Sequence, residues 1–297
     1  MNEIVRDDAK GVDVIVAEDR EKRPHLKGRE GCIFCRGSED RTPPTLAAYP
    51  NEKEWRVRRF RNAFPALSPS TKKFAWRRNR APAIGAHDVI VETEKHSQSF
   101  QDFSRGHLEL VWEAYRDAFA EHAEHRGTKF VFLMRNRGLS AGASIPHEHA
   151  QILSLPFVPR YIAGEMRAKK CGFCKPEKIG KLLFERKGFA CVLPFAPRFP
   201  CESWIIPKRH ARVLTDLTDC EGVAFLEALQ EALKRTSVYT EEYNVAFHCA
   251  PRGGDLHLHA EIYPRKNIWA AVEYGTGLVL NPVGTKQALK ILSRVSP

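Results

Sequence analysis

The chain has 297 residues, 43% of them hydrophobic, which is enough for one large globular domain or two of ordinary size. The N-terminal segment MNEIVRDDAKG lacks an apolar stretch, and nowhere do about 18 apolar residues run together, so neither a secretory signal nor a membrane span is expected. A cytoplasmic protein is the expectation. The formal net charge of +11 fits an anionic ligand, such as nucleotide phosphates or nucleic acid, and solvated basic faces are the alternative for each basic run.

Two CxxC pairs, Cys32/Cys35 and Cys171/Cys174, account for four of the eight cysteines. In a reducing compartment this spacing favours a metal over a disulfide, because one turn then delivers two thiolates. A redox CxxC should open a helix. The first pair instead stands in GCIFCRGSEDRTPP, which runs into Gly and Pro and predicts a turn.

A helix is expected next, after the segment HSQSFQDFS that starts at His96. Ser104 ends this segment and is a good N-cap residue. The following apolar residues recur at helical spacing and predict a buried face: Leu108, Val111, Trp112, Tyr115 and Phe119. A strand-like run, KFVFLMRNRG at 129–138, follows the helix, and HEHAQI comes after it at 147–152.

The same order of features occurs a second time in the chain. CGFC is followed by HARVLTDLT from His210 to Thr218, a second amphipathic stretch, the strand-like run EYNVAFHCAPRGG and HLHAEI at 257–262. Such self-similarity indicates two related units. We therefore predict an α+β protein of two tandem halves, 1–164 and 165–297, each an antiparallel sheet with a helix packed on it.

Each half offers two cysteines and two histidines as zinc ligands. The first set is Cys32, Cys35, His96 and His147, and the second is Cys171, Cys174, His210 and His257. Two thiolates and two imidazoles make a closed tetrahedral set, which is typical of structural zinc. We predict two such Zn²⁺ sites, although the second half could have lost its metal.

The first histidine of each HxH motif is thus a predicted ligand, and the second is left free. In an extended segment His147, His149 and Gln151 would share one face, while Glu148 would point away. An ordinary polar strand face is the alternative interpretation. A positioned neutral histidine is a good nucleophile toward phosphorus, and Gln151 could donate its amide N–H to a phosphoryl oxygen. Because an amide is no general base, this pair favours transfer over hydrolysis.

These motifs resemble those of the galactose-1-phosphate uridylyltransferase family, the transferase branch of the histidine-triad superfamily, over nearly the whole chain. CIFCRGSEDRTPP is similar to the family's CPFCPGNExRTPP, and RNRG…GASIPHEHAQI is similar to its ENKG…GCSNPHPHGQI. The resemblance implies two triad-type halves, and a nucleotidyl group carried on His149 with Gln151 holding the phosphate. The implied substrate-binding residues are Arg20, Arg23, Asn62, Asn136 and Ser144.

The implied substrates are a nucleoside diphosphate sugar with a sugar 1-phosphate or phosphate as acceptor. A homodimer is left open by the sequence. Glu148 replaces the family's usual proline, and the C-terminal EYGTGLVLNPVG is more similar to plant-type ADP-glucose phosphorylase than to the galactose enzymes. The family also has a Glu/His metal site, and the resemblance leaves open whether the corresponding residues bind a cation here: Glu165, His248, His259 and Glu261. Neither the base nor the sugar can be chosen from these motifs.

Two alternative functions are compatible with parts of this pattern. A dinucleoside polyphosphate phosphorylase also uses a histidine followed by glutamine. A non-enzymatic zinc protein that binds nucleic acid would use the basic runs RVRRFR (56–61) and KKFAWRRNR (72–80). This second alternative leaves the HxHxQ motif unexplained, so nucleic acid is not the expected partner.

Overall fold

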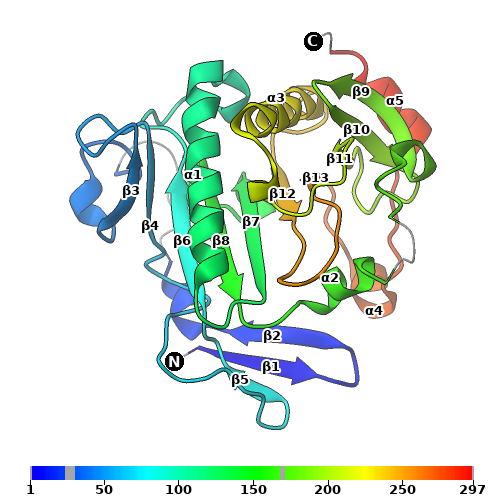
Figure 1. Ribbon diagram of the computed structural model, residues 1–297. Coiled ribbons are helices and arrows are strands. Elements are labelled where there is room, and N and C mark those ends of the chain that lie inside the picture. The colour runs from blue at the N-terminus through cyan, green and yellow to red at the C-terminus, as the bar shows by residue number, and fades with distance from the viewer. Residues whose placement is uncertain (1, 24–30, 168–170, 296–297) are drawn as a thin grey trace.

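The computed structural model describes residues 2–23, 31–167 and 171–295 (Figure 1). Its helices are α1 (Arg105–Glu124), α2 (Arg160–Glu165), α3 (Asp219–Thr236), α4 (Ala271–Thr276) and α5 (Thr285–Leu292). Its strands are β1 (Glu3–Asp7), β2 (Val12–Val16), β3 (Thr45–Tyr49), β4 (Val57–Arg61), β5 (Arg80–Pro82), β6 (Ala86–Val91), β7 (Phe130–Arg137), β8 (His149–Leu155), β9 (Gly180–Arg186), β10 (Phe189–Pro194), β11 (Ser203–Pro207), β12 (Tyr243–His248) and β13 (His259–Pro264).

Ten of these strands form one sheet in the order β3-β4-β6-β8-β7-β12-β13-β11-β10-β9. Counted inward from either edge the two halves match, with β8 corresponding to β13 and β7 to β12. The halves join where β7 pairs antiparallel with β12, from Tyr243 opposite Arg137 to Phe247 opposite Leu133. The predicted α+β class is confirmed, and the two antiparallel sheets are continuous with each other.

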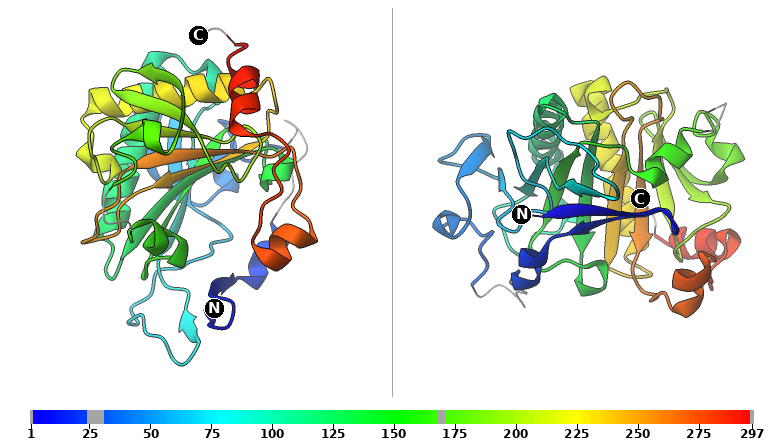
Figure 2. Two further views of the ribbon diagram at one scale, coloured as in Figure 1. Left: turned by 90° about the vertical axis from the view of Figure 1, so that its right-hand side faces the viewer. Right: turned by 90° about the horizontal axis from the view of Figure 1, so that it is seen from below.

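The two long helices lie on one face of this sheet (Figures 1 and 2). The Ser104 side chain accepts a hydrogen bond from the His107 N–H at the start of α1. Thr218 caps α3 in the same way, and Glu221 completes a capping box there. These caps satisfy N–H groups that a helix start leaves unpaired, so both helices begin where the sequence predicted.

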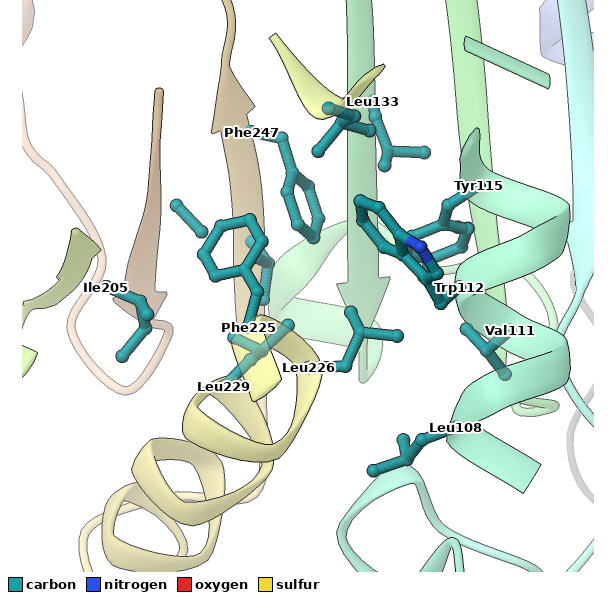
Figure 3. Close-up of a cluster of buried hydrophobic side chains, with 14 of the residues drawn as sticks. Leu108, Val111, Trp112, Tyr115, Leu133, Ile205, Phe225, Leu226, Leu229 and Phe247 are labelled. Atoms are coloured by element: carbon teal, nitrogen blue, oxygen red, sulfur yellow. The ribbon is translucent and has the colours of Figure 1, made fainter. Parts of the chain in front are cut away.

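A single core fills the space between the helices and the sheet (Figure 3). It combines residues of both halves, including Trp112 and Tyr115 from α1 and Phe225 and Leu229 from α3. A Cβ on Gly222 would lie 1.8 Å from the Trp112 ring, so only glycine permits this close approach of the two helices. The predicted apolar stripes therefore meet each other as well as the sheet.

The N-terminal hairpin β1–β2 and the short β5 form a separate three-stranded sheet in the order β2-β1-β5. Figure 1 shows it below the main sheet, near the end of α1 and β8. The predicted boundary between residues 164 and 165 falls inside α2 and stays a prediction, since both halves share one sheet and one core. Among the described residues, no helix combines the length and the hydropathy needed to cross a bilayer.

Candidate active site

The strand β8 begins at His149 and lies between β6 and β7. His149 is only 7% exposed, and its Nδ1 lies 2.7 Å from the carbonyl oxygen of His147. A carbonyl can only accept, so in the neutral ring Nδ1 carries the proton and Nε2 keeps its lone pair. Burial lowers the pKa of His149 and favours this neutral form. The Phe34 ring packs edge-on against the imidazole at 5.2 Å between centroids.

His149 and Gln151 line a cavity of about 270 Å³. All five residues expected to bind substrate line the same cavity: Arg20, Arg23, Asn62, Asn136 and Ser144. The structure thus brings together residues from five separate segments of the N-terminal half. His147 lies outside this group, in the bend that precedes β8, so the strand itself carries only the second histidine and the glutamine.

The cavity is suited to an anion. Arg41 joins Arg20 and Arg23 in its wall, and none of the described residues that line it is Asp or Glu. Burial, and then the nearby charge of Arg23, lower the pKa of Arg20. Neighbouring guanidinium groups in a wall whose described residues include no carboxylate favour binding of negative charge such as phosphate.

The side-chain amides in the cavity wall are held by hydrogen bonds at their oxygen atoms. The Oδ1 of Asn136 accepts from Nδ2 of Asn244, which belongs to β12 in the other half, at 2.7 Å. The Oε1 of Gln151 accepts from Nε2 of His87 at 3.0 Å and from Nδ2 of Asn62 at 3.4 Å. In each amide the NH₂ group is therefore left on the other side, where it can donate to a ligand.

The first predicted metal set comes together beside the cavity. One ligand atom from each of Cys32, Cys35, His96 and His147 lies within 4.8 Å of the other three. The sulfurs of Cys32 and Cys35 lie 3.5 and 3.7 Å from Nδ1 of His147. The Nε2 of His147 lies 2.7 Å from the Thr93 carbonyl, so Nε2 carries the proton and the Nδ1 lone pair faces the thiols.

The second predicted metal set is grouped in the same way: Cys171, Cys174, His210 and His257. The His257 Nδ1 lies 3.4 Å from the Cys171 sulfur, and its Nε2 lies 2.9 Å from the Pro207 carbonyl. His210 donates from Nε2 to the Asp255 carboxylate at 2.9 Å. Cys174 and His210 are exposed, in contrast to the more enclosed first set.

A third group of potential ligands consists of Glu165, His248, His259 and Glu261. Three of them are buried, but Glu261 already accepts from Nη2 of Arg198 at 2.6 Å. His248 hydrogen bonds to Glu165 at 3.0 Å. Each carboxylate therefore already has a partner within the protein: the Arg198 guanidinium for Glu261 and the His248 imidazole for Glu165. These contacts neither require nor exclude a bound cation.

Glu148 points away from the cavity, as strand alternation predicts. Its carboxylate pairs with Arg135 at 2.7 Å and with Arg137, and the Arg135 guanidinium also binds the buried carboxylate of Glu92. The Glu148 carbonyl accepts from the backbone N–H of Glu92 at 3.0 Å. These contacts hold Glu148, and with it the backbone between His147 and His149, on the side away from the cavity.

Sequence reasoning missed several residues of the cavity wall, among them Phe34, Arg41 and Thr42, and also missed His87 behind Gln151. Phe34, Arg41 and Thr42 lie within the quoted CIFCRGSEDRTPP segment, so that motif contained a signal for them. His87 precedes Asp88 near the start of β6 and belongs to no recognisable motif, so no signal in the sequence pointed to its role.

The chain matches the sequence model described as "Galactose-1-phosphate uridyl transferase, N-terminal domain" over residues 8–159. It is 29% identical to an ADP-glucose phosphorylase of Arabidopsis thaliana, covering 89% of this chain and 82% of the relative. It is 28% identical to a galactose-1-phosphate uridylyltransferase of Thermotoga maritima, covering 94% of both chains.

Solved structures give the same result. The crystal structure of the Arabidopsis thaliana ADP-glucose phosphorylase with bound ADP-glucose superposes with a TM-score of 0.81 at 28% identity, and all of both chains is covered. A uridylyltransferase structure superposes with a TM-score of 0.80 at 25% identity over 98% of this chain and 97% of the other. The resemblance expected from the motifs is confirmed, and the chain is an enzyme of the galactose-1-phosphate uridyl transferase family.

Proposed function

We propose that this enzyme moves a nucleoside monophosphate from a nucleoside diphosphate sugar to a hexose 1-phosphate or to phosphate, through a covalent intermediate on His149. The single observation that carries the proposal is the hydrogen bond from Nδ1 of His149 to the His147 carbonyl. It leaves the Nε2 lone pair of a buried, neutral imidazole in a cavity walled by arginines and amides. This is the arrangement expected of a histidine nucleophile toward phosphorus.

The reaction has two half-reactions. In the first, the Nε2 lone pair of His149 attacks the α-phosphorus, an N–P bond forms, and the bond from that phosphorus to the bridging oxygen breaks. The sugar 1-phosphate leaves with the bonding electrons. In the second, a phosphate oxygen of the acceptor attacks the same phosphorus and the N–P bond breaks. Nδ1 keeps its proton throughout, and its hydrogen bond to the carbonyl stabilises the cationic ring of the intermediate.

Gln151 would donate its amide N–H to the phosphoryl oxygen on which negative charge builds during attack. Arg20 and Arg23 would bind the phosphates, and Asn136 and Ser144 would contact them. Asn62 would lie at the nucleoside end of the cavity. Support for these roles comes from the shared cavity and from the orientation of the amides by Asn244 and His87.

The relatives support the substrate class. One is named an ADP-glucose phosphorylase and has a structure with bound ADP-glucose, and another is named a galactose-1-phosphate uridylyltransferase. Their similarity to this chain is nearly equal, so adenosine and uridine diphosphate sugars are both proposed donors. A panel of UDP- and ADP-hexoses with phosphate or hexose 1-phosphate as acceptor chooses between them.

Two structural zinc ions per chain are part of the proposal, held by Cys32, Cys35, His96 and His147 and by Cys171, Cys174, His210 and His257. Tetrahedral zinc with Zn–S of about 2.3 Å and Zn–N of about 2.05 Å needs S···N separations of about 3.6 Å. The separations between sulfur and Nδ1 run from 3.3 to 3.7 Å in the two sets. The donor sets therefore fit this metal, which supplies no step of the reaction.

We propose different roles for the two halves, 1–164 and 165–297. The first would carry the nucleophile, and the second would support it through Asn244 and the shared sheet. We place the enzyme in the cytoplasm, because the proposed zinc thiolates need a reducing compartment. A homodimer stays a prediction, to be checked by light scattering.

Intact-mass measurement tests the central claim. After incubation with UDP-glucose or ADP-glucose and rapid quenching at alkaline pH, the chain should gain one UMP or AMP, and peptide mapping should place it on His149. Gain of nucleotide on another residue, or none with any member of the donor panel, removes the covalent mechanism.

A further inference from the structure

His87 is a buried histidine on β6 that lies directly behind Gln151. It stands opposite Leu153 in the β6–β8 ladder, while Val89 stands opposite Gln151. His87 and Gln151 are thus diagonal neighbours on one face of the sheet, within reach of each other's side chains. His87 is only 2% exposed, and it is not among the described residues that line the cavity.

The protonation of the His87 ring follows from its two hydrogen bonds. Its Nδ1 lies 3.0 Å from the backbone nitrogen of Ala66, and this N–H can only donate. In the neutral ring Nδ1 is therefore the acceptor and Nε2 carries the proton. Burial lowers the pKa of His87 to about 4, so the ring is neutral near pH 7. Its Nε2–H then donates to Oε1 of Gln151 at 3.0 Å.

Asn62 is fixed in the same direction. The backbone N–H of Phe64 donates to Oδ1 of Asn62 at 2.9 Å, which leaves Nδ2 to donate to Oε1 of Gln151 at 3.4 Å. The Nδ2 of Asn62 and the Nε2 of His87 are 3.2 Å apart because both donate to one oxygen. Rotating the Gln151 amide by 180° would set its NH₂ group against two donors.

We propose that His87 is a positioning residue that fixes the carboxamide of Gln151 with its NH₂ group toward the phosphoryl group being transferred. The backbone N–H of Ala66 determines this orientation through two consecutive hydrogen bonds. It donates to Nδ1 of His87, which places the ring proton on Nε2, and Nε2–H then donates to Oε1 of Gln151. This inference rests on the proposed function. It adds to that function the reason why Gln151 presents a donor, and not an acceptor, to a negatively charged oxygen.

The kinetic test is a double-mutant cycle on the first half-reaction. We expect His87→Leu to slow nucleotide transfer to His149 by about 10- to 100-fold, since a single oriented donor in such a site is worth about 10²- to 10³-fold. In a Gln151→Ala background the same substitution should change the rate by less than about 3-fold. His87→Gln, whose amide can donate from nearly the same place, should restore most of the rate.

The control is His122→Gln, which changes another fully buried histidine that lies outside the cavity. It should leave the transfer rate within about 3-fold of wild type. Zinc content and the unfolding midpoint are measured for every variant. Equal slowing by His87→Leu with and without Gln151 would mean a general packing effect and would overturn the inference.

A second measurement does not depend on activity. Two-bond ¹⁵N–¹H correlation spectra of histidine-labelled protein, with His87 assigned from its loss in His87→Gln, report which ring nitrogen carries the proton. The Nε2–H form is expected, and the Nδ1–H form overturns the inference. If wild type gains no nucleotide but shows the Nε2–H form, the proposed function fails and the proposed role of His87 in transfer fails with it, while the orientation of the amide stands. If wild type gains nucleotide but shows Nδ1–H, only the inference fails.

Discussion

His149 and His259 occupy corresponding positions in the two halves, and each donates from Nδ1 to the carbonyl of the residue two earlier in the chain, at 2.7 and 2.8 Å. Their surroundings differ. Two residues after His149 comes the neutral Gln151, whereas two residues after His259 comes Glu261. A carboxylate would repel an incoming phosphate, so we predict that only the first copy performs nucleotidyl transfer.

This relationship supplies a matched pair of substitutions. His149→Gly should abolish nucleotide transfer, with a loss of at least about 10⁴-fold, because the nucleophile is gone. His259→Gly removes the equivalent ring from the other half and should leave labelling of His149 intact in the folded protein. Intact mass and zinc content are measured on both. Loss of labelling from both variants with unchanged folding would contradict a single catalytic half.

His147 should behave differently from His149, although only one residue separates them. His147→Ala should lose about one zinc per chain, because its Nδ1 faces the two thiols, whereas His149→Gly should keep both metals. Elemental analysis of purified protein checks this contrast. Equal zinc content in the two variants would remove His147 from the ligand set.

Removal of either proposed zinc should destabilise the enzyme, and loss of the first should cost more activity. Cys32→Ser should lose one metal and loosen the wall that carries Phe34, which packs against His149. Cys171→Ser should lose the other, more exposed metal and retain more activity. Zinc analysis, thermal unfolding and first-turnover rates separate these outcomes. Equal loss of activity from both would argue for catalytically equivalent halves.

Gln151→His should slow transfer and admit hydrolysis, because an imidazole can act as acid or base where the amide cannot. The expected loss of transfer is about 10²- to 10³-fold, the value of one oriented donor. Release of free UMP or AMP without an acceptor measures the hydrolysis. Glu261→His, at the corresponding position of the other half, is the control and should release no extra nucleotide.

Glu148 should be important for stability, although it stands outside the cavity. Glu148→Ala leaves the buried Arg135 and the half-buried Arg137 short of a carboxylate, and losing one partner of a buried ion pair typically costs about 3–5 kcal/mol. Glu185 pairs with Lys208 at 2.9 Å on the surface, so Glu185→Ala should cost at most about 1 kcal/mol. Urea denaturation measures both, and similar costs would contradict this account.

Local patterns predicted much of the fold and site, because their physical causes are local. Ser104 and Thr218 precede apolar stripes and cap the helices as expected. The metal sets followed from ligand chemistry and spacing. Pairing of β7 with β12 was not predictable, since nothing in either strand specifies which edge meets which. His87 was missed for the same reason: its role exists only through the register of β6 against β8.

The neutral His87 ring should also make stability depend on pH. Burial lowers its pKa to about 4 in the folded enzyme, whereas the unfolded value is about 6.5. Between these pH values the unfolded chain binds a proton that the folded chain does not, so stability present above about pH 6.5 is lost as the pH falls toward about 4. The contribution of this group is about 3 kcal/mol at most.

Because the proposed zinc ligands would also gain protons in this range, the measurement is the difference between wild type and His87→Gln in urea denaturation at a series of pH values. The free energy of unfolding of wild type should fall more steeply than that of the variant below about pH 6.5, and parallel curves would show that His87 is not held neutral by the fold.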